Sequence, residues 1–188
     1  MIAAVVLAAG GATRFGTTKQ LARYRGKPLV QHAVDAARDA GIEDVVVVVG
    51  HDRERVTSVI RGVRFAVNDR YAEGQSTSVI AGIDALGPDV EGAVVVLADQ
   101  PGITGHHVRA LLDAASRDPR PIARLVFADG RGPTLLRREI WDDVRVLTGD
   151  AGARLLADAR PELVLEVRIP EPAPLDVDTP DDLRRLDG

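Results

Sequence analysis

Two cationic side chains lie in a glycine-rich segment near the start of the chain. The segment from Leu7 to Gln20 reads LAAGGATRFGTTKQ, and Arg14 and Lys19 are its charged residues. When a strand runs into such a turn, successive backbone N–H groups become available to bind phosphate. Arg binds phosphate as a planar fork and Lys as a point charge, so the two together could neutralise a polyphosphate. An ordinary turn with solvated charges is the alternative that composition alone leaves open.

The first part of this segment has almost no side-chain bulk. Ala8, Ala9 and Gly10 would let a flat ring lie directly on the backbone. The segment is not a Walker A loop, because no Lys directly follows Gly16, and it lacks the GxGxxG spacing of nicotinamide dinucleotide sites. The residues therefore argue against a nicotinamide-dependent oxidoreductase.

Carboxylates that could bind a metal ion follow later in the chain. Asp99 comes just after the apolar run at residues 93–97, where a buried carboxylate is costly unless it is paired or coordinated. Carboxylates beside a polyphosphate imply Mg²⁺, which prefers one or two carboxylates together with phosphate oxygens. Asp176 and Asp178 are further candidates, since alternate residues of an extended segment point the same way. Asp178 also precedes Pro180 as a helix N-cap would, and taken alone the residues favour the cap.

The alternation of apolar runs with amphipathic stretches predicts the scaffold that holds these residues. Strands are expected at residues 2–7, 45–49, 63–67, 93–97, 122–127 and 163–169, the last of them at a sheet edge. Helices are expected from Pro28 to Gly41, at 52–60, 76–85, after Thr104, and at 137–144, 151–159 and 180–186. This order predicts an α/β fold: a single three-layer domain over residues 1–188, with a mostly parallel, Rossmann-like sheet and helices on both faces. Ligands of such sheets bind beyond the carboxyl ends of the strands, so the glycine-rich segment and Asp99 should share one edge.

Composition bounds the class of protein. The chain has 188 residues, 45% hydrophobic and 28% charged, with a net charge of −4, which argues against an extended nucleic-acid-binding face. It contains no Cys, which excludes disulfides, thiolate metal sites and a Cys nucleophile. No apolar run approaches the roughly 20 residues of a membrane helix, and the first residues lack the basic start of a signal peptide. We therefore expect a cytoplasmic protein without membrane contacts.

Lysine use is strongly biased. Of 24 basic residues, only Lys19 and Lys27 are lysines, and a Lys kept in so Arg-rich a chain indicates a need for a compact ammonium. The His residues are interpreted as structural, with His51 the nearest to the predicted site. Trp141, at helical spacing from Val144, is expected in the core.

The order of these motifs resembles that of a known family. LAAGGATRFGTTK is similar to the signature loop LAAG-x-x-x-R-x-G-x-x-K of the molybdenum cofactor nucleotidyltransferases. LAAG in place of LAGG is typical of the CTP-using branch, the molybdenum cofactor cytidylyltransferases. The resemblance continues in order along nearly the whole chain, through residues 26–29, 68, 73–78, 97–101, 149–154 and 176–183.

This resemblance implies a fold of the nucleotide-diphospho-sugar transferase type and a role for each matched residue. The implied contacts of the base and ribose are Leu7, Ala8, Ala9, Gly10 and Gly11, with Ser78 near the base. Arg14 and Lys19 would hold the triphosphate. Asp99 and Asp178 would bind Mg²⁺, so the resemblance favours the metal role of Asp178, with capping as a compatible second role.

The reaction implied by the resemblance is nucleotidyl transfer. The terminal phosphate of the molybdopterin (molybdenum) cofactor would attack the α-phosphate of CTP, pyrophosphate would leave, and a molybdoenzyme would be the eventual recipient. Such a phosphate needs no general base because its second pKa is about 6. Arg14, Lys19 and Asp99 would then act by alignment and charge neutralisation. CTP is implied by Ala9, where GTP users have Gly, whereas Gly132 departs from the His that many members have in the region facing the acceptor.

Two other functions fit the same residues. The acceptor could be a sugar phosphate or another phosphorylated metabolite, with the chemistry unchanged. The chain could instead bind a nucleotide or the pterin cofactor and pass it to a partner enzyme without catalysis. Two metal-type carboxylates kept together with Arg14 and Lys19 argue against such a carrier.

Overall fold

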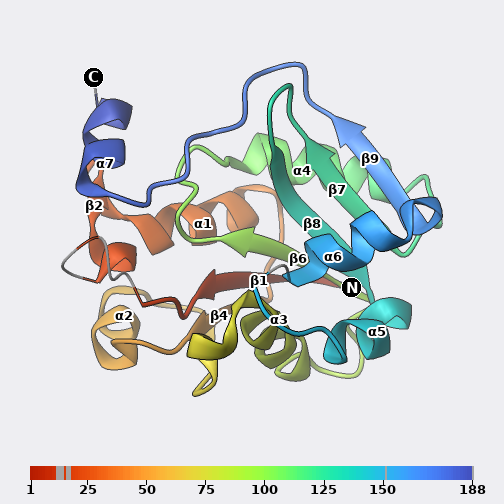
Figure 1. Ribbon diagram of the computed structural model, residues 1–188, viewed down its shortest axis with the longest axis horizontal. Helices are drawn as coiled ribbons and strands as arrows, with labels where there is room; N and C mark the ends of the chain where they lie inside the picture. Colours follow the sequence, from red (N-terminus) through yellow and green to blue (C-terminus); the bar gives the residue numbers. More distant parts are fainter. Residues whose placement is uncertain (12–14, 16–17, 151, 188) are drawn as a thin grey trace.

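The computed structural model describes the chain except for residues 12–14, 16–17, 151 and 188, and its helices lie on both faces of a central sheet (Figure 1). Arg14, one of the two predicted phosphate ligands, lies outside the described residues. No helix in the part of the chain that the structure describes is long and apolar enough to cross a membrane.

Seven strands of the described chain form the central sheet, in the order β5-β4-β1-β6-β8-β7-β9. Their bounds are β1 (Ile2–Ala8), β4 (Val45–Val49), β5 (Arg64–Val67), β6 (Gly92–Leu97), β7 (Ile122–Val126), β8 (Arg131–Arg137) and β9 (Val164–Arg168). Neighbouring strands are parallel except around β8, which pairs antiparallel with both β6 and β7. The predicted mostly parallel sheet is confirmed, and β9 lies at its edge as expected.

The central strands are covered on both faces, which explains their uninterrupted apolar sequences. One core cluster joins alternate β1 residues such as Val6 to α1 (Leu29–Asp39) and α4 (Gly105–Ala115). The other cluster joins Val5 to α3 (Gln75–Asp84), α5 (Trp141–Arg145) and α6 (Gly152–Ala159). Trp141 is buried in this second cluster, which confirms its predicted core position.

Most predicted helices are confirmed, with small shifts at their ends. α1 begins at Leu29, one residue later than expected, and Gly41 follows it with a left-handed φ of +91°. Thr104 caps α4, and His107 completes the capping box, so this His is structural as expected. The remaining helices are α2 (Arg53–Val59) and α7 (Pro180–Asp187).

Strand β8 was missed, and the helix predicted at residues 137–144 was wrong at its start. Arg137 is the last residue of β8, and α5 begins only at Trp141, after a 3₁₀ turn. Pro133 makes this strand hard to recognise in the sequence, because Pro cannot donate a ladder hydrogen bond. Pro133 is tolerated here because it lies beyond the last β6 pair and opposite the register shift between Arg124 and Val126 of β7.

A two-stranded hairpin was also missed. It consists of β2 (Arg23–Tyr24) and β3 (Lys27–Pro28), joined by Arg25 and Gly26, both with positive φ. Helix α7 packs on this hairpin through Tyr24, Leu183 and neighbouring apolar residues. The hairpin therefore fixes the segment just before α7, which carries Asp178, beside Lys19.

Candidate active site

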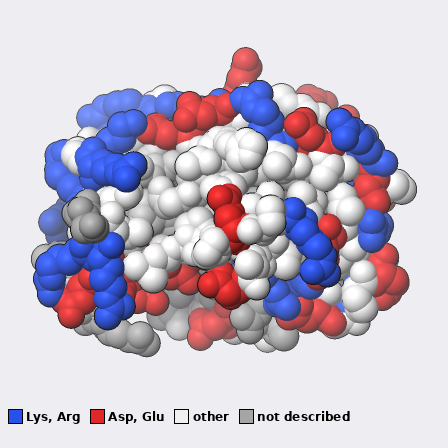
Figure 2. Space-filling view, turned by 90° about the horizontal axis from the view of Figure 1, so that it is seen from above, with Lys and Arg blue, Asp and Glu red and all other residues white. Residues whose placement is uncertain are grey.

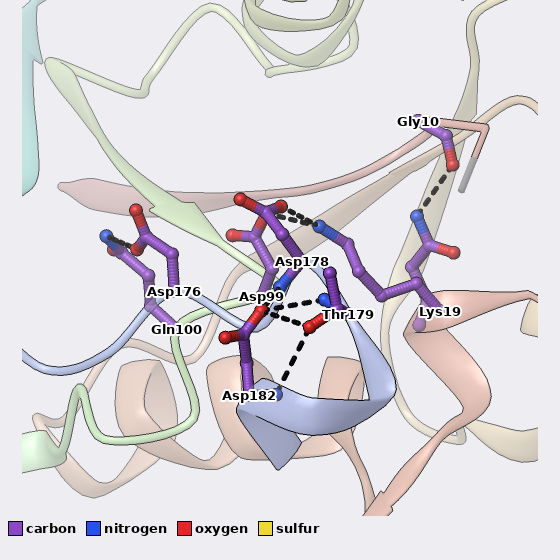
Figure 3. A network of polar contacts seen from close by, with 9 residues as sticks. Gly10, Lys19, Asp99, Gln100, Asp176, Asp178, Thr179 and Asp182 are labelled. Carbon is purple, nitrogen blue, oxygen red and sulfur yellow. Dashed lines mark hydrogen bonds and ion pairs between the residues drawn. The ribbon is translucent and has the colours of Figure 1, made fainter. Parts of the chain in front are cut away.

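Three charged side chains from distant parts of the chain meet at the carboxyl end of β6. Lys19 Nζ lies 2.9 Å from Oδ2 of Asp99 and 3.0 Å from Oδ1 of Asp178 (Figure 3). Lys19 is in the 3₁₀ turn Lys19–Leu21, Asp99 follows β6, and Asp178 directly precedes the cap of α7. The structure therefore brings together the predicted cation and both predicted metal carboxylates.

The electrostatics of this cluster centre on Lys19, whose side chain is 14% exposed. Loss of solvent alone would lower the pKa of Lys19, but the charge and hydrogen bond of Asp99, joined by those of Asp178, outweigh it and raise the pKa above its usual value. The side chain of Lys19 is thus positively charged at neutral pH. The second lysine, Lys27, is exposed on the hairpin and pairs with Asp35 at 2.6 Å. Only Lys19 of the two belongs to this cluster.

The interpretation of Asp178 as the helix cap was wrong. Thr179 and Asp182 form the capping box of α7: Asp182 N donates to Thr179 Oγ1 at 3.2 Å, and Thr179 N donates to Asp182 Oδ2 at 2.8 Å. Because the cap is provided one residue later, the carboxylate of Asp178 is left to face Lys19.

A third carboxylate, Asp176, lies next to this cluster. Its Oδ1 accepts a hydrogen bond from Gln100 Nε2 at 2.7 Å, and the fully buried Val177 donates its N–H to the carbonyl of Asp99 at 2.9 Å. Asp176 and Asp178 both face the site from this extended segment, as their alternation predicts (Figure 3). Partial loss of solvent, followed by the negative charges of Asp99 and Asp178, raises the pKa of Asp176.

The described start of the glycine-rich segment combines buried alanines with exposed glycines. Ala8 and Ala9 are buried at the end of β1, whereas Gly10 and Gly11 are exposed, and a Cβ placed on Gly10 would meet no atom within 4 Å. Gln20 Nε2 donates to the carbonyl of Gly10 at 2.8 Å. A flat ligand can therefore approach the backbone at Gly10, and Gln20 fixes that backbone relative to Lys19.

The turn between β4 and α2 holds the segment at both ends, a role that the sequence analysis missed. His51 N donates to the carbonyl of Ala9 at 3.1 Å. Asp52, in a left-handed conformation with φ of 52°, accepts a hydrogen bond from the hydroxyl of buried Thr18. That hydrogen bond is the main cause of a lowered pKa of Asp52. A non-Gly residue with positive φ is the signal of a constrained position, but it is visible only in the structure.

Ser78 is separate from the charged cluster in its polar contacts. It is buried on α3, and its hydroxyl oxygen accepts a hydrogen bond from Asn68 Nδ2 at 2.9 Å. Asn68 also donates to Thr77, so it orients the first turns of α3. Helix α3 lies close on β1, because a Cβ on Gly82 would be 2.2 Å from Val5 Cγ1. Ser78 is therefore carried by the helix that packs on the strand leading to Gly10.

A cavity of about 500 Å³ opens beside the cluster. Gln100, the partner of Asp176, lines it, together with Leu97, Gly132 and residues of α3 and β8. The cations at its wall are matched by carboxylates: buried Arg124 pairs with Asp158 at 2.8 Å and Glu166 at 2.9 Å, and Arg131 pairs with Asp158 at 3.0 Å. Figure 2 shows a face with acidic groups near its middle and Lys and Arg gathered toward its ends.

Gly132, which lines this cavity, has no room for a side chain. A Cβ at this position would be 2.7 Å from Cε2 of Phe127 and 3.2 Å from Cβ of Leu125. The ring of Phe127 thus occupies the space beside the backbone where a His side chain would begin. Gly132, which stands where many family members have His, therefore lies against the ring of Phe127.

The donor set fits a magnesium ion accompanied by phosphate. In the described residues, no group of three or more His, Asp or Glu side chains forms a metal cluster by itself. Asp99 and Asp178 supply two carboxylates, and Oδ1 of Asp99 is buried without a hydrogen-bond partner. Mg²⁺ binds in proteins through one or two carboxylates and completes its shell with phosphate oxygens and water.

Comparison with known proteins points to one family. A family model described as the MobA-like NTP transferase domain matches residues 4–163. Nicotine blue oxidoreductase of Paenarthrobacter nicotinovorans is 32% identical over 98% of this chain and 96% of that protein. The bifunctional protein GlmU of Streptomyces coelicolor is 40% identical over 74% of this chain, but the match spans only 28% of GlmU.

Solved structures resemble the whole chain. Rv0371c of Mycobacterium tuberculosis superposes with a TM-score of 0.88 and 31% identity, covering 98% of this chain and 96% of that one. A complex of Rv0371c with manganese superposes with a TM-score of 0.85 and 30% identity, covering 98% and 97%. These matches confirm the α/β fold predicted from the sequence.

Proposed function

This chain belongs to the MobA-like NTP transferase family, and we propose that it transfers CMP from CTP to the terminal phosphate of the molybdopterin cofactor, releasing pyrophosphate. The observation that carries the proposal is the cluster of Lys19, Asp99 and Asp178 beside the exposed backbone of Gly10. A cation next to two carboxylates at the carboxyl end of a central strand suits a metal-bound triphosphate.

The proposed reaction requires alignment and charge neutralisation. An oxygen of the acceptor phosphate forms a bond to the α-phosphorus of CTP as the bond from that phosphorus to the bridging oxygen breaks, and pyrophosphate carries away the electron pair. Lys19 and Arg14 hold the triphosphate in line. Asp99 and Asp178 would hold Mg²⁺, which, when bound, neutralises charge on the phosphates. The acceptor phosphate is ionised at neutral pH, so none of these residues has to remove a proton.

The nucleotide would lie along the end of β1. In this proposal the backbone from Leu7 to Gly11 contacts the base and ribose, and the open approach to Gly10 supports it. Ser78 lies near the base; its oxygen accepts from Asn68, so its hydrogen is the group that it can offer to a pyrimidine carbonyl. Ala9, in place of the Gly of GTP users, is the residue that favours CTP.

The acceptor would occupy the cavity beside Gln100, with its phosphate toward Lys19. Arg124 and Arg131 already have carboxylate partners, so the cavity suits an uncharged ring system better than a second phosphate. Gly132 and Phe127 replace the His of many relatives at this cavity. A different phosphorylated acceptor, such as a sugar phosphate, is the alternative that this difference favours.

An assay of pyrophosphate release tests the proposal. The purified chain is incubated with Mg²⁺, with CTP or GTP, and with molybdopterin or a panel of sugar phosphates as acceptors. We expect release with CTP and molybdopterin, and much less with GTP. Pyrophosphate release only with a sugar phosphate would show that the acceptor is a sugar phosphate and not molybdopterin. Nucleotide binding that is independent of Mg²⁺, without any pyrophosphate release, would indicate a carrier.

One relative makes a redox control necessary. Nicotine blue oxidoreductase matches the chain over nearly its whole length. The same preparation is therefore tested for reduction of nicotine blue with a reduced nicotinamide dinucleotide as electron donor. Dye reduction without pyrophosphate release in any combination would refute nucleotidyl transfer.

A further inference from the structure

Lys19 bonds one oxygen of each of the two carboxylates that would bind a metal ion. Its ammonium is 2.9 Å from Oδ2 of Asp99 and 3.0 Å from Oδ1 of Asp178 (Figure 3). A divalent ion shared by these carboxylates requires metal–oxygen distances of about 2.0–2.6 Å. An ion bound to the same two oxygens as Lys19 would overlap its ammonium. An ion bound to the other oxygens of the two carboxylates would be repelled by the positive charge of the ammonium. The ion and the ammonium therefore compete for the same pair of carboxylates.

The space next to Asp99 is small while Lys19 is there. The void lined by Leu7, Lys19, Gln20, Ala98 and Asp99 measures about 20 Å³. A void of this size holds about one water molecule. Oδ1 of Asp99 is buried without a partner, so a larger ligand reaches it only after a lining side chain moves.

Lys19 is the side chain best able to move. The residues on either side of it are held through their side chains: the hydroxyl of Thr18 donates to Asp52, and the amide of Gln20 donates to the carbonyl of Gly10. Its own stem, in contrast, has four flexible carbons, and its ammonium can exchange one oxygen partner for another. A triphosphate bound along the glycine-rich segment would supply such oxygens within reach of the same stem.

We propose that Lys19 is an internal cation that keeps free divalent metal off Asp99 and Asp178 until a nucleotide binds. The inference rests on the proposed function, because the phosphates of the nucleotide are the anions that draw the ammonium away. Metal alone must displace Lys19 with no new partner for it, whereas metal with nucleotide brings one. Metal and nucleotide therefore bind cooperatively, and each tightens the other by the same factor.

Binding of Mn²⁺ in the absence of nucleotide tests this role without any turnover. The EPR signal of free Mn²⁺ is titrated with the wild-type chain, with Lys19→Met, which keeps the stem and removes the charge, and with Lys27→Met as the matched control. Lys19→Met should bind Mn²⁺ about tenfold more tightly or better, within the 5–150-fold range of coupled sites. Lys27→Met should match the wild type, and adding Asp178→Asn to Lys19→Met should abolish the gain. Equal or weaker Mn²⁺ binding by a folded Lys19→Met would overturn the proposal.

The wild-type chain gives a second test that no substitution can confound. Since Lys19 and Lys27 are its two lysines, ¹⁵N-lysine labelling yields two side-chain ammonium signals, which Lys27→Met assigns. Mg²⁺ alone should leave the Lys19 signal in place, and Mg²⁺ at the same concentration with CTP should move it. Movement with Mg²⁺ alone, or none with any of the four nucleoside triphosphates, would contradict the inference. Pyrophosphate release in the presence of either contradiction would leave the proposed function standing.

Discussion

Replacement of Lys19 by Ala, compared with replacement of the exposed Lys27, tests whether Lys19 has the proposed role in turnover. Loss of one preorganised electrostatic partner of a transition state lowers turnover by about 10²–10³, or about 2.7–4 kcal/mol. We expect this loss for Lys19→Ala, because its ammonium lies between Asp99 and Asp178, where the proposal places the triphosphate. Lys27→Ala should turn over like the wild type, since its one carboxylate partner, Asp35, lies on α1.

The stability cost of the same change can be worked out from exposure. Breaking a fully buried ion pair costs about 3–5 kcal/mol. The side chains of Asp99 and Asp178 are 29% and 56% exposed, so solvent screening reduces the cost of Lys19→Ala to about 1–2 kcal/mol. Native proteins are stable by about 5–15 kcal/mol, so the variant stays folded and unfolding does not explain lost turnover.

The assay combines pyrophosphate release with urea unfolding of each variant. Lys19→Arg is the third member of the set: it keeps the charge, so it should recover stability, but its planar fork does not replace a compact ammonium and turnover should stay low. A Lys19→Ala protein that turns over at the wild-type rate would refute the assignment of this residue to the triphosphate.

Three further outcomes follow from the geometry. Asp99→Asn should lower Mg²⁺-dependent turnover by about 10²–10³, and a normal rate in the pyrophosphate assay would exclude it as a metal ligand. Asp176→Asn should raise the free energy of unfolding at pH 7: an acid whose pKa is raised in the fold favours the folded state below its unfolded pKa of about 3.9, and this contribution is lost as the pH rises through the higher folded pKa. Urea unfolding at pH 7 and pH 4 should therefore show a gain that shrinks at the lower pH, and a gain that is larger at pH 4 would contradict this account. Gly82→Ala should destabilise the fold by about 1–3 kcal/mol, although Ala favours helices, because its Cβ would overlap Val5; unchanged thermal unfolding would show that α3 can shift on β1.

Much of the scaffold could be read from local patterns. Apolar runs such as Val45–Val49 predicted buried strands, and their alternation with amphipathic stretches predicted a parallel sheet with helices on both faces. Those patterns also put Lys19 and Asp99 at one sheet edge, where their side chains meet. Hydrophobic periodicity and helix capping depend on residues that are close in the sequence, so they can be recognised without knowledge of the fold.

The antiparallel strand and the state of the site were decided only by tertiary structure. Strand β8 was not predicted from the sequence; it contains Pro133, which cannot donate a ladder hydrogen bond and lies opposite a register shift in the neighbouring β7. Asp178 had the spacing of a cap, yet Thr179 provides the cap and leaves that carboxylate to Lys19, which is 159 residues away in the chain. Contacts of this kind depend on which segments the packed core brings together, and no local pattern records that choice.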